Sequence, residues 1–117
     1  MKQESMEESL RRIKKHTDEL AELEDQLRDF QTKSDDISIP IRLKIALELD
    51  DKGKPKYSNE QKREGEFHNR ISNVVNYAVF SKHIFDTLQD IEKAKRQIRY
   101  AELEFSMWKA LCYAQKE

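Results

Sequence analysis

The chain has very few of the residues that turn a backbone, because only two glycines and two prolines occur in 117 residues. Few secondary-structure elements are therefore expected, and a β-sandwich or β-barrel, which needs many turns, is not. Long apolar runs are also missing, since no stretch approaches about eighteen apolar residues and the first residues are polar. We expect neither a membrane span nor a signal peptide, and hence a cytoplasmic protein with no membrane partner.

Cysteine is almost absent as well. Because Cys112 is the single cysteine, neither an intramolecular disulfide nor a cysteine-based zinc site can form within one chain. The histidines His16, His68 and His83 do not form the His-Glu-x-x-His or paired Glu-x-x-His patterns of metal sites. A glycine-rich phosphate loop and a nucleophile elbow are missing too. The sequence therefore predicts no catalytic, cofactor-binding or metal-binding residue, and no enzyme.

Charge, in contrast, is abundant and nearly balanced. Charged residues make up 38% of the chain and hydrophobic residues 37%, which is too polar for a conventional globule of this size and favours a long helical or oligomeric protein. Basic and acidic residues number 7 and 11 in 1–36, 7 and 5 in 37–65, and 8 and 7 in 66–117, which gives net charges of −4, +2 and +1. A dedicated nucleic-acid binder would be strongly basic, so only a local patch could serve that role.

Residues 4–33 predict a first helix, since they contain no glycine and no proline. Apolar side chains and one threonine recur at alternating four- and three-residue steps, with Glu24 at the one position that is missing, a stripe typical of a coiled coil. A helix with so narrow a stripe needs a partner surface for its stability. The stripe consists of Met6, Leu10, Ile13, Thr17, Leu20 and Leu27.

Residues 59–115 predict a second helical region. Ser58 and Gln61 have the spacing of a capping box, so the helix is expected to begin at Asn59. A continuous helix and a helix broken near 72–76 are both compatible with the poor helix formers in that stretch. An antiparallel return of the first helix on the second would form a hydrophobic anchor from Met6, Leu10, Ile13, Phe105, Trp108 and Cys112.

The segment between the two helical regions has apolar residues at every second position: Ile37, Ile39, Ile41, Leu43, Ile45, Leu47 and Leu49. This period predicts a strand, whereas on a helix the same residues would split onto two opposed faces. Gly53 fits a hairpin turn and Pro55 the start of a return strand, so we predict a small β-hairpin over about 38–58. The alternative is an all-α chain in which 40–51 is helical, with Pro40 at its first position.

The predicted fold is therefore mainly α: one elongated domain, 1–117, in which an antiparallel coiled-coil helical hairpin carries the β-hairpin between its helices. The isoleucine segment and the broad apolar face of 74–88 exceed what one partner helix can cover, which predicts a homo-oligomer and a further protein partner. The candidate interface residues are Ile39, Ile41, Leu43, Ile45, Val75, Val79, Phe80 and Ile84.

The turn itself is basic. Lysines contact phosphate as point charges, and a tyrosine can stack on an unpaired base, so the turn is a candidate contact for nucleic acid or for a partner protein. A solvated turn is the competing interpretation, because Asp50, Asp51, Glu60 and Glu64 dilute the charge. The candidate contact residues are Lys52, Lys54, Lys56, Tyr57, Lys62 and Arg63.

The stretch 50–80 resembles a group of small phage-borne and bacterial coiled-coil proteins that share a GK-x-x-YSNE-x-x-R motif. The matching residues are Gly53, Lys54, Tyr57, Ser58, Asn59, Glu60, Arg63, Ile71, Asn73 and Tyr77. Some members of the group are encoded among phage replication and recombination genes, so the resemblance implies a setting in phage DNA metabolism, gives no mechanism and supplies no catalytic residue.

The predicted function is thus that of a non-enzymatic, oligomeric binding or assembly protein that contacts nucleic acid through the basic turn. The order helix, β-hairpin, helix also resembles prefoldin subunits, although no prefoldin motif residue is matched. A prefoldin-like holdase or a protein–protein adaptor with no nucleic-acid role is the alternative.

Overall fold

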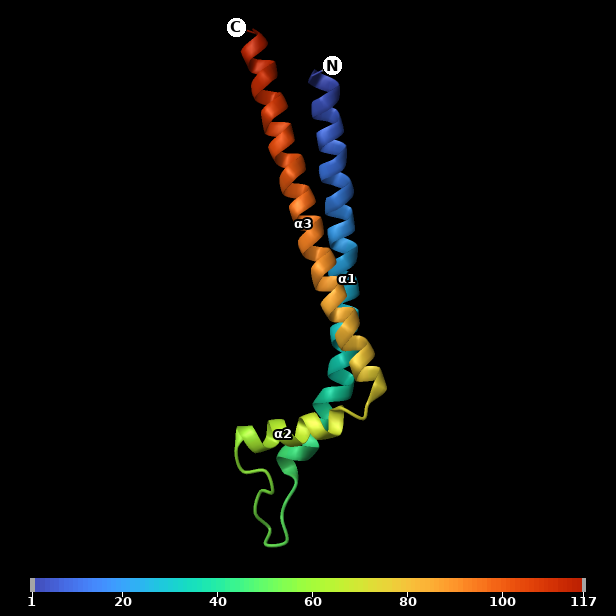
Figure 1. Ribbon diagram of the computed structural model, residues 1–117, viewed down its shortest axis with the longest axis vertical. Coiled ribbons are helices and arrows are strands. Elements are labelled where there is room, and N and C mark those ends of the chain that lie inside the picture. The colour runs from blue at the N-terminus through green and yellow to red at the C-terminus, as the bar shows by residue number, and fades with distance from the viewer. Residues whose placement is uncertain (1, 117) are drawn as a thin grey trace. The chain divides into compact units, whose positions relative to one another are not determined.

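The computed structural model describes residues 2–116 and contains three helices, α1 (Lys2–Leu47), α2 (Glu60–Ile71) and α3 (Val75–Lys116) (Figure 1). The mainly α fold class is confirmed. The described residues contain no strand, and their β-structure is limited to one isolated bridge. The break between α2 and α3 falls at 72–74, inside the stretch where a break was considered.

The residues group into two units. The first unit contains the chain up to Leu27 and from Asp86 onward, and the second unit is Arg28–Phe85. Both long helices contribute to both units, whereas α2 belongs to the second alone. The single domain over 1–117 stays a prediction.

In the first unit, the beginning of α1 and the end of α3 lie side by side and run antiparallel (Figure 1). Ser9 of α1 is buried, together with Ile91, Ala94 and Ala101 of α3. Because three of these four side chains are small, the helices can approach closely. An ion pair between Arg12 and Glu104 also joins the two helices.

The stripe of α1 that faces the partner helix in this unit is shifted by one residue at alternate places of the predicted stripe, as Ser9 is buried in place of Leu10. Thr17 is exposed, and its hydroxyl donates a hydrogen bond to the carbonyl of Ile13 at 2.7 Å. His16 is half-buried instead, and so is Leu23, which is not among the residues of the predicted stripe. A heptad spacing of three and four residues is kept, but a histidine takes one of its places.

The second unit has its own core of Ile45, Phe67 and Ile71, in which α2 packs across the end of α1 (Figure 1). Five partly buried side chains pack against this core: Ile37, Ile41, Tyr57, Val74 and Tyr77. The N-cap of α2 is Asn59, whose side-chain oxygen accepts the N–H of Lys62 at 2.8 Å. The predicted cap at Ser58 was therefore one residue too early.

The β-hairpin over 38–58 and the end of the first helix at 33 were wrong. The helix α1 continues through Pro40 to Leu47, and Leu49 and Pro55 form only an isolated antiparallel bridge. Proline inside a helix costs about 3 kcal/mol. Burial of Ile45 against α2 offsets this cost, and Pro40 is exposed. The alternative of a helix over 40–51 was closer, but Pro40 does not begin a helix.

Candidate binding surfaces

The turn between α1 and α2 is organised by Asp50. Its side-chain oxygen accepts the backbone N–H groups of Lys52 and Lys54, each at 2.9 Å. Its backbone N–H donates to the carbonyl of Lys54 at 2.8 Å, and its carbonyl accepts the N–H of Gly53 at 3.0 Å. Gly53 has φ = 77°, a left-handed conformation that suits glycine. The prediction that the chain turns at Gly53 is confirmed, although the flanking strands are missing.

Arg70 of α2 ties the base of this turn to the end of α1. Its guanidinium bonds the carboxylates of Glu48 at 2.6 Å and Glu66 at 2.7 Å, and donates to the Tyr57 hydroxyl at 3.4 Å. The hydrogen bond from Arg70 lowers the pKa of Glu48 below its ordinary value of 4.5, and nearby lysines add to this effect. Arg70 thereby fixes the two ends of the turn relative to each other, since it bonds Glu48 before the turn and Tyr57 after it.

Three of the six predicted contact residues take part in the contacts that hold the base of this turn. Tyr57 is half-buried against the core, and the cationic groups of Arg70 and Lys56 lie 5.9 and 5.7 Å from its ring centroid. Lys56 also pairs with Glu48 at 3.9 Å. Arg63 donates to the Tyr57 carbonyl at 3.3 Å. Tyr57 is therefore engaged with the core and with these two cations, and is not a free ring at the tip of the turn.

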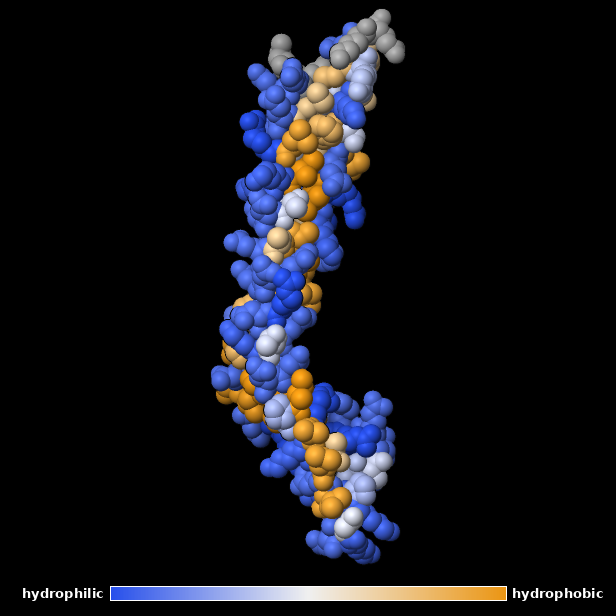
Figure 2. All heavy atoms as spheres, turned by 180° about the vertical axis from the view of Figure 1, so that it is seen from behind, coloured by the Kyte–Doolittle hydropathy of each residue, from blue (hydrophilic) through white to orange (hydrophobic). Residues whose placement is uncertain are grey.

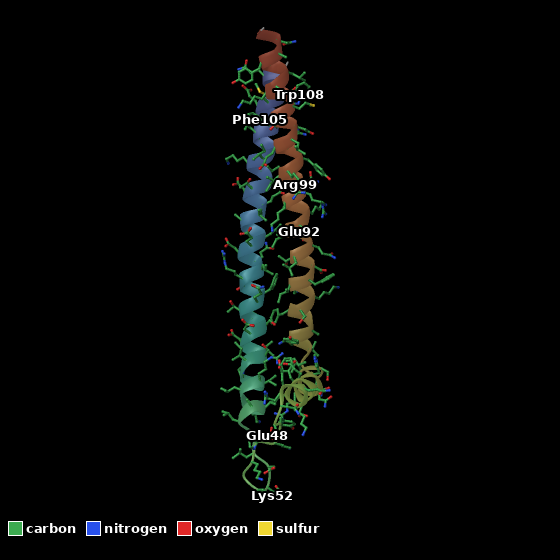
Figure 3. The ribbon with its side chains drawn as sticks, turned by 90° about the vertical axis from the view of Figure 1, so that its left-hand side faces the viewer. Glu48, Lys52, Glu92, Arg99, Phe105 and Trp108 are labelled. Carbon is green, nitrogen blue, oxygen red and sulfur yellow. The ribbon has the colours of Figure 1, made fainter. Side chains whose placement is uncertain are left out.

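Lys52, Lys54 and Lys62 are different, because they are exposed and close no salt bridge within the described residues. Figure 3 shows Lys52 at the tip of the turn, with Glu48 at its base. Because these three lysines close no ion pair, an anionic partner can reach their ammonium groups, although the exposed carboxylates of Asp50 and Asp51 lie in the same turn. The candidate basic contact therefore narrows from six residues to three.

The segment 37–47 presents two opposed apolar faces. Ile37, Ile41 and Ile45 form the inner face, which packs in the second unit's core. The outer face consists of Ile39, Leu43 and Leu47, which are 57%, 58% and 68% exposed. Hydrophobic side chains run in a line along this part of the chain when it is seen from behind (Figure 2). Of the predicted interface residues in this segment, Ile39 and Leu43 are free to contact a partner, and Ile41 and Ile45 are engaged internally.

The interface residues predicted near the start of α3 divide in the same way. Val75 and Val79 are 75% and 44% exposed. Phe80 and Ile84 are half-buried within the second unit. The ammonium group of Lys33 lies 5.9 Å from the Phe80 ring centroid, and Phe30 stacks on His83 with ring centroids 4.9 Å apart.

Sequence reasoning missed an outward apolar face at the end of α3, in the first unit. Tyr100, Leu103 and Met107 are 58%, 61% and 50% exposed, and Leu111 widens this face. The sequence did contain evidence of this face, because five apolar residues recur at three- and four-residue steps on the side of α3 that lies opposite Ile91, Ala94 and Ala101. They are Tyr100, Leu103, Met107, Ala110 and Ala114.

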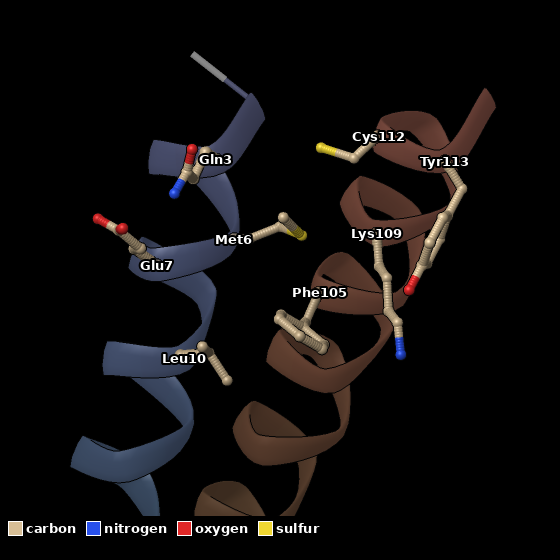
Figure 4. Close-up of a pocket in the computed structure, with 8 residues that line it drawn as sticks. All are labelled: Gln3, Met6, Glu7, Leu10, Phe105, Lys109, Cys112 and Tyr113. Atoms are coloured by element: carbon tan, nitrogen blue, oxygen red, sulfur yellow. The ribbon is translucent and has the colours of Figure 1, made fainter. Parts of the chain in front are cut away.

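The predicted hydrophobic anchor between the beginning of α1 and the end of α3 contains a groove of about 390 Å³. Met6 and Cys112 project into the space between the two helices, above Phe105 (Figure 4). Glu7 and Lys109 line the groove as charged residues. The anchor is thus packed incompletely, since Leu10, one of its predicted members, is 49% exposed.

Within residues 2–116, no group of three histidine, cysteine, aspartate or glutamate side chains is placed to hold a metal ion. None of the three helices contains, over the same residues, a stretch apolar enough to cross a bilayer. Comparisons of the chain with family models, curated proteins and solved structures gave no match. The resemblance to phage-borne helical proteins therefore remains a prediction that rests on the residues of 50–80.

Proposed function

We propose that this chain is a non-enzymatic assembly protein, which self-associates through an outward apolar face and presents a basic turn to an anionic partner. One observation carries the proposal. Among the described residues, fourteen large hydrophobic side chains are exposed, whereas six hydrophobic residues are buried. Exposed apolar side chains gathered on a helix face mark an interaction surface, whereas single ones need no explanation. The exposed set includes the aligned outer face of α1, Ile39, Leu43 and Leu47.

The basic turn gives the assembly its second contact. Self-association repeats Lys52, Lys54 and Lys62 in every copy, and repeated weak contacts bind a polyanion far more tightly than one contact does. Phosphates are contacted by lysine without reading of sequence. The proposed partner is therefore nucleic acid, bound without sequence preference, as an accessory factor in phage or bacterial DNA recombination or replication would bind it.

Two measurements test the proposal. Multi-angle light scattering from about 5 µM to 500 µM should show mass rising above 14.0 kDa. Anisotropy of labelled single-stranded DNA should rise at low salt, and Lys52→Glu/Lys54→Glu should remove the rise. Lys15→Glu/Lys82→Glu, which makes the same charge change on exposed helix positions, is the matched control and should bind nearly as the parent does. A monomer at every concentration, or equal loss in both variants, would refute the proposal.

The outward face of α3 favours one second function, a protein–protein adaptor or holdase. Tyr100, Leu103 and Met107 lie in a line and are at least half exposed, as expected for a surface that receives another helix or an unfolded chain. This function predicts that the protein suppresses aggregation of a heated client, and that Leu103→Glu/Met107→Glu loses this effect. DNA binding should be unchanged in that variant, which separates the two functions.

A further inference from the structure

We propose that the outer face of α1 is covered by the same face of a second copy, with the two helices antiparallel. This inference rests on the proposed self-association and adds the surface, the occupant and the orientation. The face is formed by Ile39, Leu43 and Leu47, which follow one another at four-residue steps. Pro40 and Ala46, beside this face, are also exposed and have small side chains that let another helix approach.

The occupant follows from the way in which apolar residues are divided on this segment. The inner face of the same helix is already covered inside the second unit, so the outer face needs cover from outside that unit. A two-fold pairing covers this face with an identical one, because each copy contributes the same patch to an isologous interface. One apolar face thus supplies both halves of the contact.

The charges beside the face fix the orientation. Asp35 and Asp36 precede the apolar side chains, and Lys44 lies among them eight residues after Asp36, about 12 Å along the helix. All three are exposed and close no salt bridge among the described residues, although the charge of Lys44 also helps to lower the pKa of Glu48. A parallel pair would set aspartate beside aspartate and lysine beside lysine. An antiparallel pair sets the acidic end of each copy beside Lys44 of the other, which is the complementary arrangement.

The register follows from the same residues. A two-fold axis near residue 41 places Ile39 of one copy against Leu43 of the other, twice. In this register Asp36 of one copy is level with Ala46 of the other, which places Asp36 and Lys44 about 3 Å apart along the helix axis, an offset that the long lysine side chain can span. The apolar contact is thus centred on Ile39 and Leu43, whereas Leu47 lies at its edge, opposite Asp35 of the other copy.

Charge variants test the orientation. Asp36→Lys alone and Lys44→Asp alone should each weaken self-association about tenfold, because each creates two like-charge contacts in an antiparallel pair. A mixture of the two variants should associate as tightly as the parent, since opposite charges then face each other at both ends. Leu43→Glu should abolish association, whereas Leu103→Glu, on the outward face of α3, is the matched control and should not. Circular dichroism checks that each variant keeps its helices.

A distance measurement gives an independent answer. With Cys112→Ser as background, a spin label at Gln31→Cys lies ten residues from the axis, so two labels should be about 30 Å apart in the antiparallel pair. A parallel pair would bring them to about 10 Å.

The outcomes separate the two proposals. Three results would overturn the antiparallel pairing in a protein that still associates: a label distance of about 10 Å, no recovery of association when the two charge variants are mixed, or association that Leu43→Glu does not change. None of these results would contradict the proposed assembly function. A protein that is monomeric at every concentration overturns both.

Discussion

The two-faced helix at 37–47 makes a sharp prediction about two residues that are only two positions apart. Ile45 is 1% exposed in the core with Phe67 and Ile71, whereas Leu43 is 58% exposed on the outer face. Ile45→Ala should therefore destabilise the folded chain strongly, and Leu43→Ala should not. A strand would place both residues on one face, so both substitutions would then have similar effects.

The expected magnitudes follow from burial. Replacing a fully buried isoleucine by alanine removes apolar contacts and leaves a cavity, which costs about 3 kcal/mol of unfolding free energy. Leu43→Ala leaves no cavity and gains slightly in helix propensity, so a change within about 0.5 kcal/mol is expected for the monomer. If Ile45→Ala leaves too little folded protein to measure, Ile45→Val takes its place in the comparison with Leu43→Ala, and it should lower the free energy of unfolding by about 1 kcal/mol.

Urea unfolding followed by far-ultraviolet circular dichroism measures both effects. With a urea dependence of about 1.5 kcal/mol per molar, a loss of 3 kcal/mol lowers the midpoint by about 2 M. The titration is run at low micromolar protein and repeated at high concentration, where Leu43→Ala should begin to lose stability because it weakens self-association. Equal midpoint shifts for Ile45→Ala and Leu43→Ala at low concentration would refute the assignment of the two faces.

Three further predictions concern the turn and the start of α2. Asn59→Ala should lower the free energy of unfolding in urea by about 1 kcal/mol because it removes the N-cap, whereas Ser58→Ala should change it little. A larger loss for Ser58→Ala than for Asn59→Ala would instead support Ser58 as the N-cap. The pKa of Glu48 is lowered from 4.5 by Arg70, so the carboxylate stabilises the fold above pH 4.5 and this contribution is lost as the pH falls through the lowered value. Glu48→Gln should accordingly flatten the decline of the melting temperature below pH 4.5, and an unchanged decline would contradict this linkage. Gly53→Ala should cost about 1 kcal/mol through its positive φ alone, since nothing lies within 4 Å of the added methyl group; an unchanged urea midpoint would contradict this.

The sequence predicted the helical class and the turn at Gly53 and left a break near 72–76 as one of two alternatives, because each of these features depends on local chemistry. Poor helix formers between α2 and α3 and a glycine at positive φ are visible without knowledge of the packing. The N-cap was missed by one residue, since Ser58 and Asn59 are both good capping residues and only the backbone conformation decides between them.

The roles within the basic turn could not be predicted from the sequence, because they depend on Arg70. That residue lies in α2, thirteen positions after Tyr57, and reaches Glu48 at the end of α1. Its contacts make Tyr57 part of the core's edge, whereas Lys52, Lys54 and Lys62 stay exposed and close no ion pair among the described residues. A charge cluster in the sequence shows which residues are near in the chain, but the folded contacts decide which of them are available.

The error over 37–49 and the proposed assembly surface have the same physical origin. Residues two apart lie about 200° apart around a helix, and residues four apart about 40°, so apolar residues at every second position form two opposed stripes. Such a pattern suits a strand with one buried face equally well, and only the core formed with Phe67 and Ile71 decides in favour of the helix. Once the segment is helical, half of its large apolar side chains must point away from that core. The feature that misled the strand prediction is therefore the feature that creates an outward surface for a second copy.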